Sequence, residues 1–133
     1  MKNDDWLNLI IEEAIEPDLE ICDPHHHLWD YPNNIYMADD LFADLRSGHN
    51  IKSTVYMECG SMYRKRGPIS MRPIGETEFA HNIAAAANQN SDIRICESIV
   101  SFADLTENSI TQVLDGHQEI SNRFVGIRHA SAW

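Results

Sequence analysis

Apolar residues along this chain follow two spacings, one typical of strands and one typical of helices. Short apolar runs predict strands at about residues 19–25, 53–59, 93–101 and 123–130. Between them, apolar residues recur every three or four positions and predict helices at about residues 38–47, 77–89 and 107–120. A helix in each gap between strands is typical of βα units, so the pattern predicts an α/β fold with a parallel sheet.

A further helix is expected before the first strand. Apolar residues from Trp6 to Ala14 recur at helical spacing, and Pro17 ends the run. We therefore divide the chain into an N-terminal helical extension, residues 1–18, and a main domain, residues 19–133.

The main domain holds about four βα units, half the number in an eight-stranded TIM barrel, which typically takes ~250 residues. Two architectures fit this count: a small four-stranded α/β domain and the first half of a TIM barrel. The sequence reaches Trp133 directly after the last predicted strand. This abrupt end favours a partial barrel over a complete small domain.

Residues 23–30 read Asp-Pro-His-His-His-Leu-Trp-Asp and follow the first apolar run. Side chains alternate faces along a strand, so His25 and His27 are expected on one side and His26 on the other. Two imidazoles at this spacing can hold one divalent cation, although they supply only half of a usual coordination shell. The alternative is a structural or solvated histidine tract that binds nothing.

Composition excludes several classes of protein. The chain has 133 residues and a net charge of −11, which argues against nucleic-acid binding. No run approaches the ~18 apolar residues of a membrane helix, and the first residues do not resemble a signal peptide. Cys22, Cys59 and Cys96 lie in apolar runs, so we expect buried thiols in a reducing compartment and hence a cytoplasmic protein.

Alternation in the second strand predicts which side chains face a site. Val55, Met57 and Cys59 are its apolar set and are expected to face the helices. Thr54, Tyr56 and Glu58 would then point inward, with Glu58 at the carboxyl end of the strand.

The same reasoning in the fourth strand places Val125 and Ile127 outward and Arg128 inward, again at the carboxyl end. Glu58 and Arg128 are therefore expected on one rim with the two histidines. The alternative is an ion pair between Glu58 and Arg128 that only closes the top of the barrel. Alternation puts His129 on the same outward face as Val125 and Ile127, so it is a weaker candidate.

A basic loop follows the second strand, between Gly60 and Gly75. It carries four basic residues: Arg64, Lys65, Arg66 and Arg72. The three arginines and Tyr63 are weaker site candidates. On an acidic protein, such a loop is a plausible lid for an anionic substrate. A solvated loop with no specific role is the alternative.

Four segments, in this order, resemble the amidohydrolase-related hydrolases, in the lactonase-like branch of the amidohydrolase superfamily. They cover residues 21–30, 54–59, 73–79 and 124–129. The resemblance implies a TIM barrel with its site at the carboxyl ends of the strands, and it places His25 and His27 in a metal or substrate site. Zinc is the expected divalent metal, although some lactonase-like members are thought to work without one. The family's later strands, which bring further histidines and an aspartate base, have no counterpart in this chain.

The resemblance therefore implies a hydrolase that directs water onto a lactone or a related carboxylic ester or amide. His25 and His27 would hold the metal, and Glu58 and Arg128 would contact a small anionic or lactone-type substrate. Without the later strands, the chain is expected to have little or no activity of its own. Two alternatives stay open: an inactive truncated remnant, and a half-barrel module that forms a homo-oligomer through exposed sheet edges.

Overall fold

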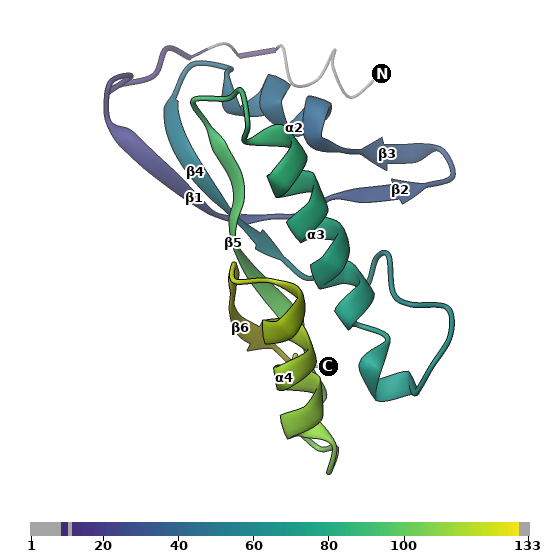
Figure 1. The fold of residues 1–133 in the computed structure, drawn as a ribbon. Coiled ribbons are helices and arrows are strands. Elements are labelled where there is room, and N and C mark those ends of the chain that lie inside the picture. The colour runs from purple at the N-terminus through teal and green to yellow at the C-terminus, as the bar shows by residue number, and fades with distance from the viewer. Residues whose placement is uncertain (1–8, 11, 131–133) are drawn as a thin grey trace.

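A computed structural model describes residues 9, 10 and 12–130. Its centre is a parallel sheet with the strand order β1–β4–β5–β6 (Figure 1). The strands are β1 (Glu20–His26), β4 (Asn50–Met57), β5 (Arg94–Phe102) and β6 (Phe124–Arg128). β4, β5 and β6 each pair with the sheet strand that precedes them in the sequence, which confirms the predicted α/β fold with a parallel sheet.

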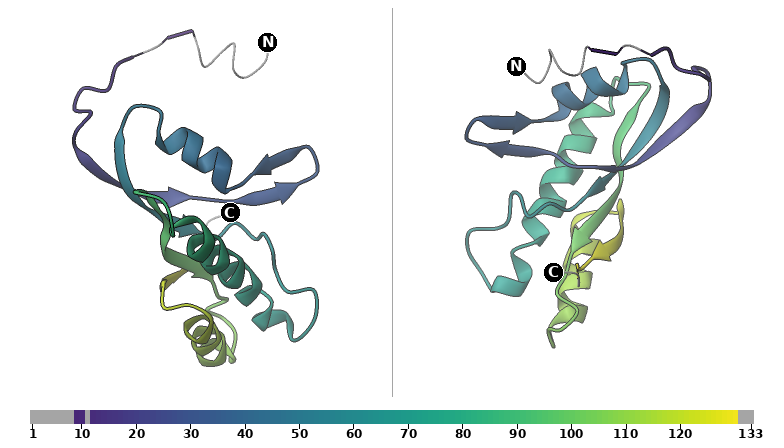
Figure 2. Two further views of the ribbon diagram at one scale, coloured as in Figure 1. Left: turned by 45° about the horizontal axis from the view of Figure 1, so that its top comes forward. Right: turned by 180° about the vertical axis from the view of Figure 1, so that it is seen from behind.

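Three helices fill the gaps between these strands: α2 (Ala38–Leu45), α3 (Ile74–Ala87) and α4 (Ile110–Ile120). A short turn of 3₁₀ helix, η1 (Ile69–Met71), precedes α3. Seen from behind, the strands lie in front of α3, which covers the opposite face of the sheet (Figure 2). Among the described residues, no helix has the length and apolarity needed to cross a membrane.

The core lies between the helices and one face of the sheet. Leu41 of α2 and Ala80 of α3 pack in one cluster with Tyr56, Ile95 and Ile99 of the strands. All five are at most 2% exposed. The predicted helices and strands therefore exist within a few residues of their expected bounds, because their apolar stripes meet in this core.

A small hairpin between β1 and α2 was not expected from the sequence. Its strands are β2 (Trp29–Tyr31) and β3 (Asn34–Tyr36), and it projects away from the main sheet (Figure 1). Pro32 and Asn33 form its two-residue turn, and Asn33 has a φ of 65°. Proline followed by a residue with positive φ is typical of a type II turn.

Two expectations are wrong for the described residues. Residues 9, 10 and 12–19 form turns, bends and irregular backbone instead of a helix, whereas residues 1–8 and 11, which include Trp6, lie outside the described part. Ile10 and Ile15 are 73% and 97% exposed, so they gain no packing that would stabilise a short helix. Cys22 is exposed and not buried, Cys59 is half-buried, and Cys96 is buried as expected.

The faces assigned to the second and fourth strands are also wrong. Tyr56 is fully buried and its hydroxyl bonds Glu76 of α3, so it faces the helices instead of a site. Phe124 likewise stacks on His117 of α4, whereas Val125 is 64% exposed on the other face. Alternation misled because parallel strands can be apolar on both faces, and a buried hydroxyl is tolerated where it is hydrogen-bonded.

Candidate functional site

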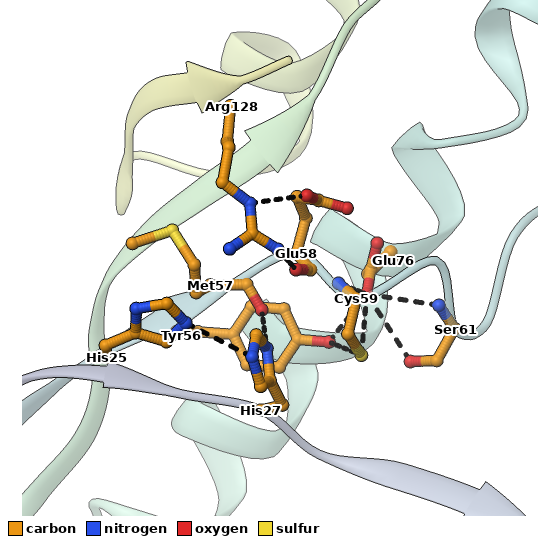
Figure 3. Close-up of polar contacts among 9 residues, drawn as sticks. All are labelled: His25, His27, Tyr56, Met57, Glu58, Cys59, Ser61, Glu76 and Arg128. Atoms are coloured by element: carbon orange, nitrogen blue, oxygen red, sulfur yellow. Dashed lines mark hydrogen bonds and ion pairs between the residues drawn. The ribbon is translucent and has the colours of Figure 1, made fainter. Parts of the chain in front are cut away.

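His25 and His27 form a close pair at the carboxyl end of β1. Their Nε2 atoms are 3.2 Å apart and their rings meet edge to face (Figure 3). His26 lies on the other face, where it packs against Tyr56 and Cys96. Burial lowers the pKa of His26 to about 4. The alternation predicted for the three histidines is therefore what the structure shows.

The hydrogen bonds of His27 fix the role of each ring nitrogen. Its Nδ1 lies 2.7 Å from the carbonyl oxygen of Met57, and a carbonyl only accepts, so Nδ1 carries the proton. In the neutral ring, Nε2 is then left with a lone pair directed toward His25. A bond of this kind behind the ligating nitrogen is what orients most metal-bound histidines.

The spacing of the pair also fits a shared metal ion. Zinc–nitrogen bonds of about 2.0–2.1 Å in tetrahedral geometry place two ligating nitrogens roughly 3.4 Å apart, close to the 3.2 Å between His25 and His27. In the described part of the chain, no group of three or more His, Cys, Asp or Glu side chains is placed to share an ion. The pair therefore offers two ligands, and a full shell would need others from water, substrate or further protein.

Glu58 and Arg128 are brought together at the same edge of the sheet. Glu58 directly follows β4, Arg128 is the last residue of β6, and the pair spans β5 (Figure 3). Arg128 Nε donates to Glu58 Oε1 at 2.7 Å, and Nη2 donates to the Glu58 carbonyl oxygen at 2.6 Å. The side chain of Glu58 is 13% exposed and that of Arg128 is 39% exposed. This geometry matches the alternative of an ion pair, and it leaves Nη1 of Arg128 for another acceptor.

The weaker candidates lie in two loops at this edge. Arg64 is 3.5 Å from Glu78 of α3, Arg72 donates to the carbonyl of Gly67, and Arg66 is exposed. His129 accepts a hydrogen bond from the backbone N–H of Leu105. None of these contacts joins the histidine pair within the described residues.

A cavity of about 560 Å³ lies between the loop after β4 and the loop after β5. Tyr63 and Arg72 line it from one side, and Phe102 and Asp104 line it from the other. Burial raises the pKa of the Tyr63 phenol. The structure therefore places two of the weaker candidates at one cavity, separate from the one beside the histidines.

A second cavity, of about 390 Å³, runs beside the histidine pair. His25, His27, Trp29 and Tyr36 are among its lining residues. Trp29 stacks on His27 at 6.1 Å between ring centroids, and Tyr31 continues the stack at 6.5 Å. Aromatic faces thus extend from the site along the hairpin.

Sequence reasoning missed a buried carboxylate behind the site. Glu76, in the first turn of α3, is 2% exposed, and its Oε1 accepts from the Tyr56 hydroxyl and the backbone N–H groups of Cys59 and Ser61. Burial raises the pKa of Tyr56 and of Cys59, and the nearby Glu76 charge acts in the same direction. The sequence contained one sign of this burial: Glu76 lies on the apolar stripe of α3, four residues before Ala80.

Comparison with known proteins gives one relative. The chain is similar to the uncharacterized protein y4mH of Sinorhizobium fredii (strain NBRC 101917 / NGR234), with 27% identity over 135 aligned positions. The match covers 85% of this chain and 40% of y4mH, so the chain spans less than half the length of this relative. No protein-family model matches the chain. No solved structure matches it either.

Proposed function

We propose that this chain is the N-terminal part of an amidohydrolase-related hydrolase of the lactonase-like branch, and that its sheet is the first half of a TIM barrel. Parallel strands in sequential order, with the helices packed on one face, agree with the way a βα barrel is built. The matched relative y4mH is more than twice as long as the matched region, which leaves room for further strands.

The observation that carries this proposal is the histidine pair at the end of the first strand. In the proposal, His25 and His27 hold a divalent metal, with zinc as the first choice. Such an ion, when bound, polarises a carbonyl or lowers the pKa of a coordinated water. The Met57 carbonyl keeps the ring of His27 turned so that its Nε2 faces the ion.

Glu58 and Arg128 would orient the substrate. Glu58 holds the guanidinium of Arg128 through Nε, and the remaining Nη1 would bind a substrate carboxylate or a developing oxyanion. The basic residues Arg64, Arg66 and Arg72 would attract a small anionic substrate toward this edge. The general base would come from strands outside this chain, so the chain alone should hydrolyse little.

The aromatic row beside the site supports a ring-shaped substrate such as a lactone. His27, Trp29 and Tyr31 stack in series, and the first two line the cavity next to the pair. Flat aromatic faces bind rings over a large apolar area without needing many hydrogen bonds.

Zinc binding by the purified chain tests the carrying observation. Isothermal titration with zinc should show one site that is lost in a His25→Ala, His27→Ala double variant. His81→Ala is the matched control, because His81 lies on α3, contacts Ser121 and does not line the cavity beside the pair, so it should leave zinc binding unchanged. His26→Ala is a poor control, since His26 is buried in the core. Equal zinc binding by the double variant would reject the metal site.

Catalysis is tested by the hydrolysis of simple lactones. The chain alone is compared with a longer version that continues the barrel. Loss of a positioned base commonly costs about 10²–10⁴-fold, so the short form should be slower by at least that order. Equal turnover by the two forms, with the short form monomeric, would contradict the half-barrel proposal.

A second candidate function is a half-barrel module that closes by pairing with another copy. It is favoured by β1 and β6, which form the two edges of the sheet and have one strand neighbour each among the described residues. Open edges promote association between sheets. Size-exclusion chromatography with light scattering separates the candidates, because a stable dimer with undiminished zinc binding supports the module.

A further inference from the structure

We propose that Glu76 is a positioning residue of the candidate site. Its carboxylate holds the loop that follows β4, and this loop is hydrogen-bonded to the end of β1. The inference rests on the proposed function only in treating His27 and Glu58 as the residues to be positioned. Glu76 itself lies behind the sheet and does not reach the site surface (Figure 3).

The first link runs from Glu76 to the end of β4. Its Oε1 accepts the backbone N–H of Cys59 at 2.9 Å and that of Ser61 at 3.2 Å. Gly60 lies between them with a φ of +77°, a conformation that glycine adopts without steric cost. The N–H groups on the two sides of Gly60 thus converge on one oxygen and form a small anion-binding concavity. Glu58 directly precedes this anchored segment, and its carboxylate and carbonyl oxygens accept from Arg128.

The second link runs from the same loop to the end of β1. The hydroxyl of Ser61 donates to the carbonyl oxygen of Leu28 at 3.1 Å. Leu28 is fully buried and directly follows His27. The imidazole of His27 in turn donates to the carbonyl of Met57 at the end of β4. Glu76, the loop and the two strand ends therefore form one connected set of hydrogen bonds.

The packing around Glu76 shows that the helix and the loop are fitted closely together. A Cβ atom on Gly75 would lie 2.6 Å from the carbonyl oxygen of Met62 and 2.7 Å from the backbone nitrogen of Arg64. Only glycine permits this approach of the loop to the first turn of α3. A carboxylate in that turn is also favoured by the helix dipole, which strengthens its bonds to the loop.

The two oxygens of Glu76 differ, and this difference makes the inference testable. Oε1 accepts all the bonds, whereas Oε2 has no hydrogen-bond partner among the described residues. An amide oxygen can replace Oε1, so Glu76→Gln should keep the loop in place. Glu76→Ala removes the acceptor and leaves the N–H groups of Cys59 and Ser61 without it.

The experiment records ¹⁵N spectra of the histidine rings in the purified chain and measures zinc affinity by titration. In Glu76→Ala, the ring nitrogens of His27 should shift as its bond to Met57 is lost, and zinc affinity should fall about tenfold or more. Glu76→Gln should retain the wild-type spectrum. Thr77→Val is the control for lost stability, because Thr77 is the next buried polar residue of α3 and its bonds to Ser101 and His117 lie away from the site. It is recorded under conditions where the variant is folded, and only the His27 signals are compared.

Unchanged His27 signals in a folded Glu76→Ala chain would overturn the inference, as would an equal shift in Thr77→Val. If Glu76→Ala does not fold, Ser61→Ala decides, because it removes the hydroxyl that contacts Leu28 and Glu76 but keeps the backbone bond of Ser61 to Glu76. It should still shift His27, and no shift would overturn the inference. A wild-type chain that binds no zinc, but whose His27 signals respond to Glu76→Ala, would reject the metal site and retain the positioning role.

Discussion

Thr77→Val is expected to destabilise the fold strongly, because Thr77 is the centre of a fully buried polar chain. Its hydroxyl contacts the Ser101 hydroxyl and lies 2.8 Å from Nδ1 of His117. Nε2 of His117 donates to the carbonyl of Phe102 at 3.1 Å, so Nδ1 of the neutral ring is an acceptor. Thr77 must therefore donate to His117, and Ser101 must donate to Thr77.

The magnitude follows from the groups that lose their partners. Valine has nearly the shape of threonine, so the change leaves no cavity but removes both hydrogen bonds. His117 is fully buried and Ser101 is 2% exposed, so water cannot replace the lost hydroxyl. Each buried group left without its partner costs about 1–3 kcal/mol, which gives about 2–6 kcal/mol for the pair. A domain of this size has about 5–15 kcal/mol of stability, so the loss is large.

Urea unfolding followed by circular dichroism measures this loss. Thr77→Ser keeps the hydroxyl and loses one methyl group, so it should cost only about 1 kcal/mol. The cost of Thr77→Val combined with Ser101→Ala should be less than the sum of the single costs, because both remove the same bond. A Thr77→Val chain within about 0.5 kcal/mol of wild type would refute the assignment of the network.

Three further predictions concern single residues. Burial lowers the pKa of His117 from its ordinary 6.5, so the unfolded chain takes up the proton first. Its contribution to stability is therefore present above a pH of about 6.5 and is lost as the pH falls below it, as unfolding in urea at neutral and mildly acidic pH should show. Gly75→Ala should lower the melting temperature although alanine favours helix by about 1 kcal/mol, because the new Cβ would meet Met62 at 2.6 Å. Asn33→Ala should destabilise the β2–β3 hairpin by about 1 kcal/mol and Asn33→Gly should not, since φ is 65°; amide exchange of the hairpin measures both.

Local patterns in the sequence were enough to predict the four strands of the main sheet, the three helices between them and the histidine pair. Helical spacing identified α2 through Leu41 and Leu45, because a stripe on one face meets the core wherever the helix docks. The shared face of His25 and His27 followed from strand alternation alone. Each of these inferences depends on neighbours within a few residues.

The network behind the site could not be predicted in the same way, because it joins residues that are far apart in the sequence. Ser61 bonds Leu28, 33 residues before it, and Tyr56 bonds Glu76, 20 residues after it. The same limitation explains the inverted faces of β4 and β6. Alternation shows which residues share a face, but only the position of the helices shows which face they cover.

The face of the sheet opposite the helices connects the two candidate functions. Val55 and Met57 point to this face, because Tyr56 between them points to the helices, and both are half-buried. Val125 on β6 is 64% exposed. Apolar side chains in this position are typical of a barrel interior, where further strands would cover them. A second copy of the chain would cover the same residues, but it would also bring a second histidine pair to the far side of the same rim, because the parallel strands of a closed barrel all end at one rim. The two arrangements therefore differ in the number of His25–His27 pairs in each closed barrel. A continued barrel has one pair, and a paired module has two.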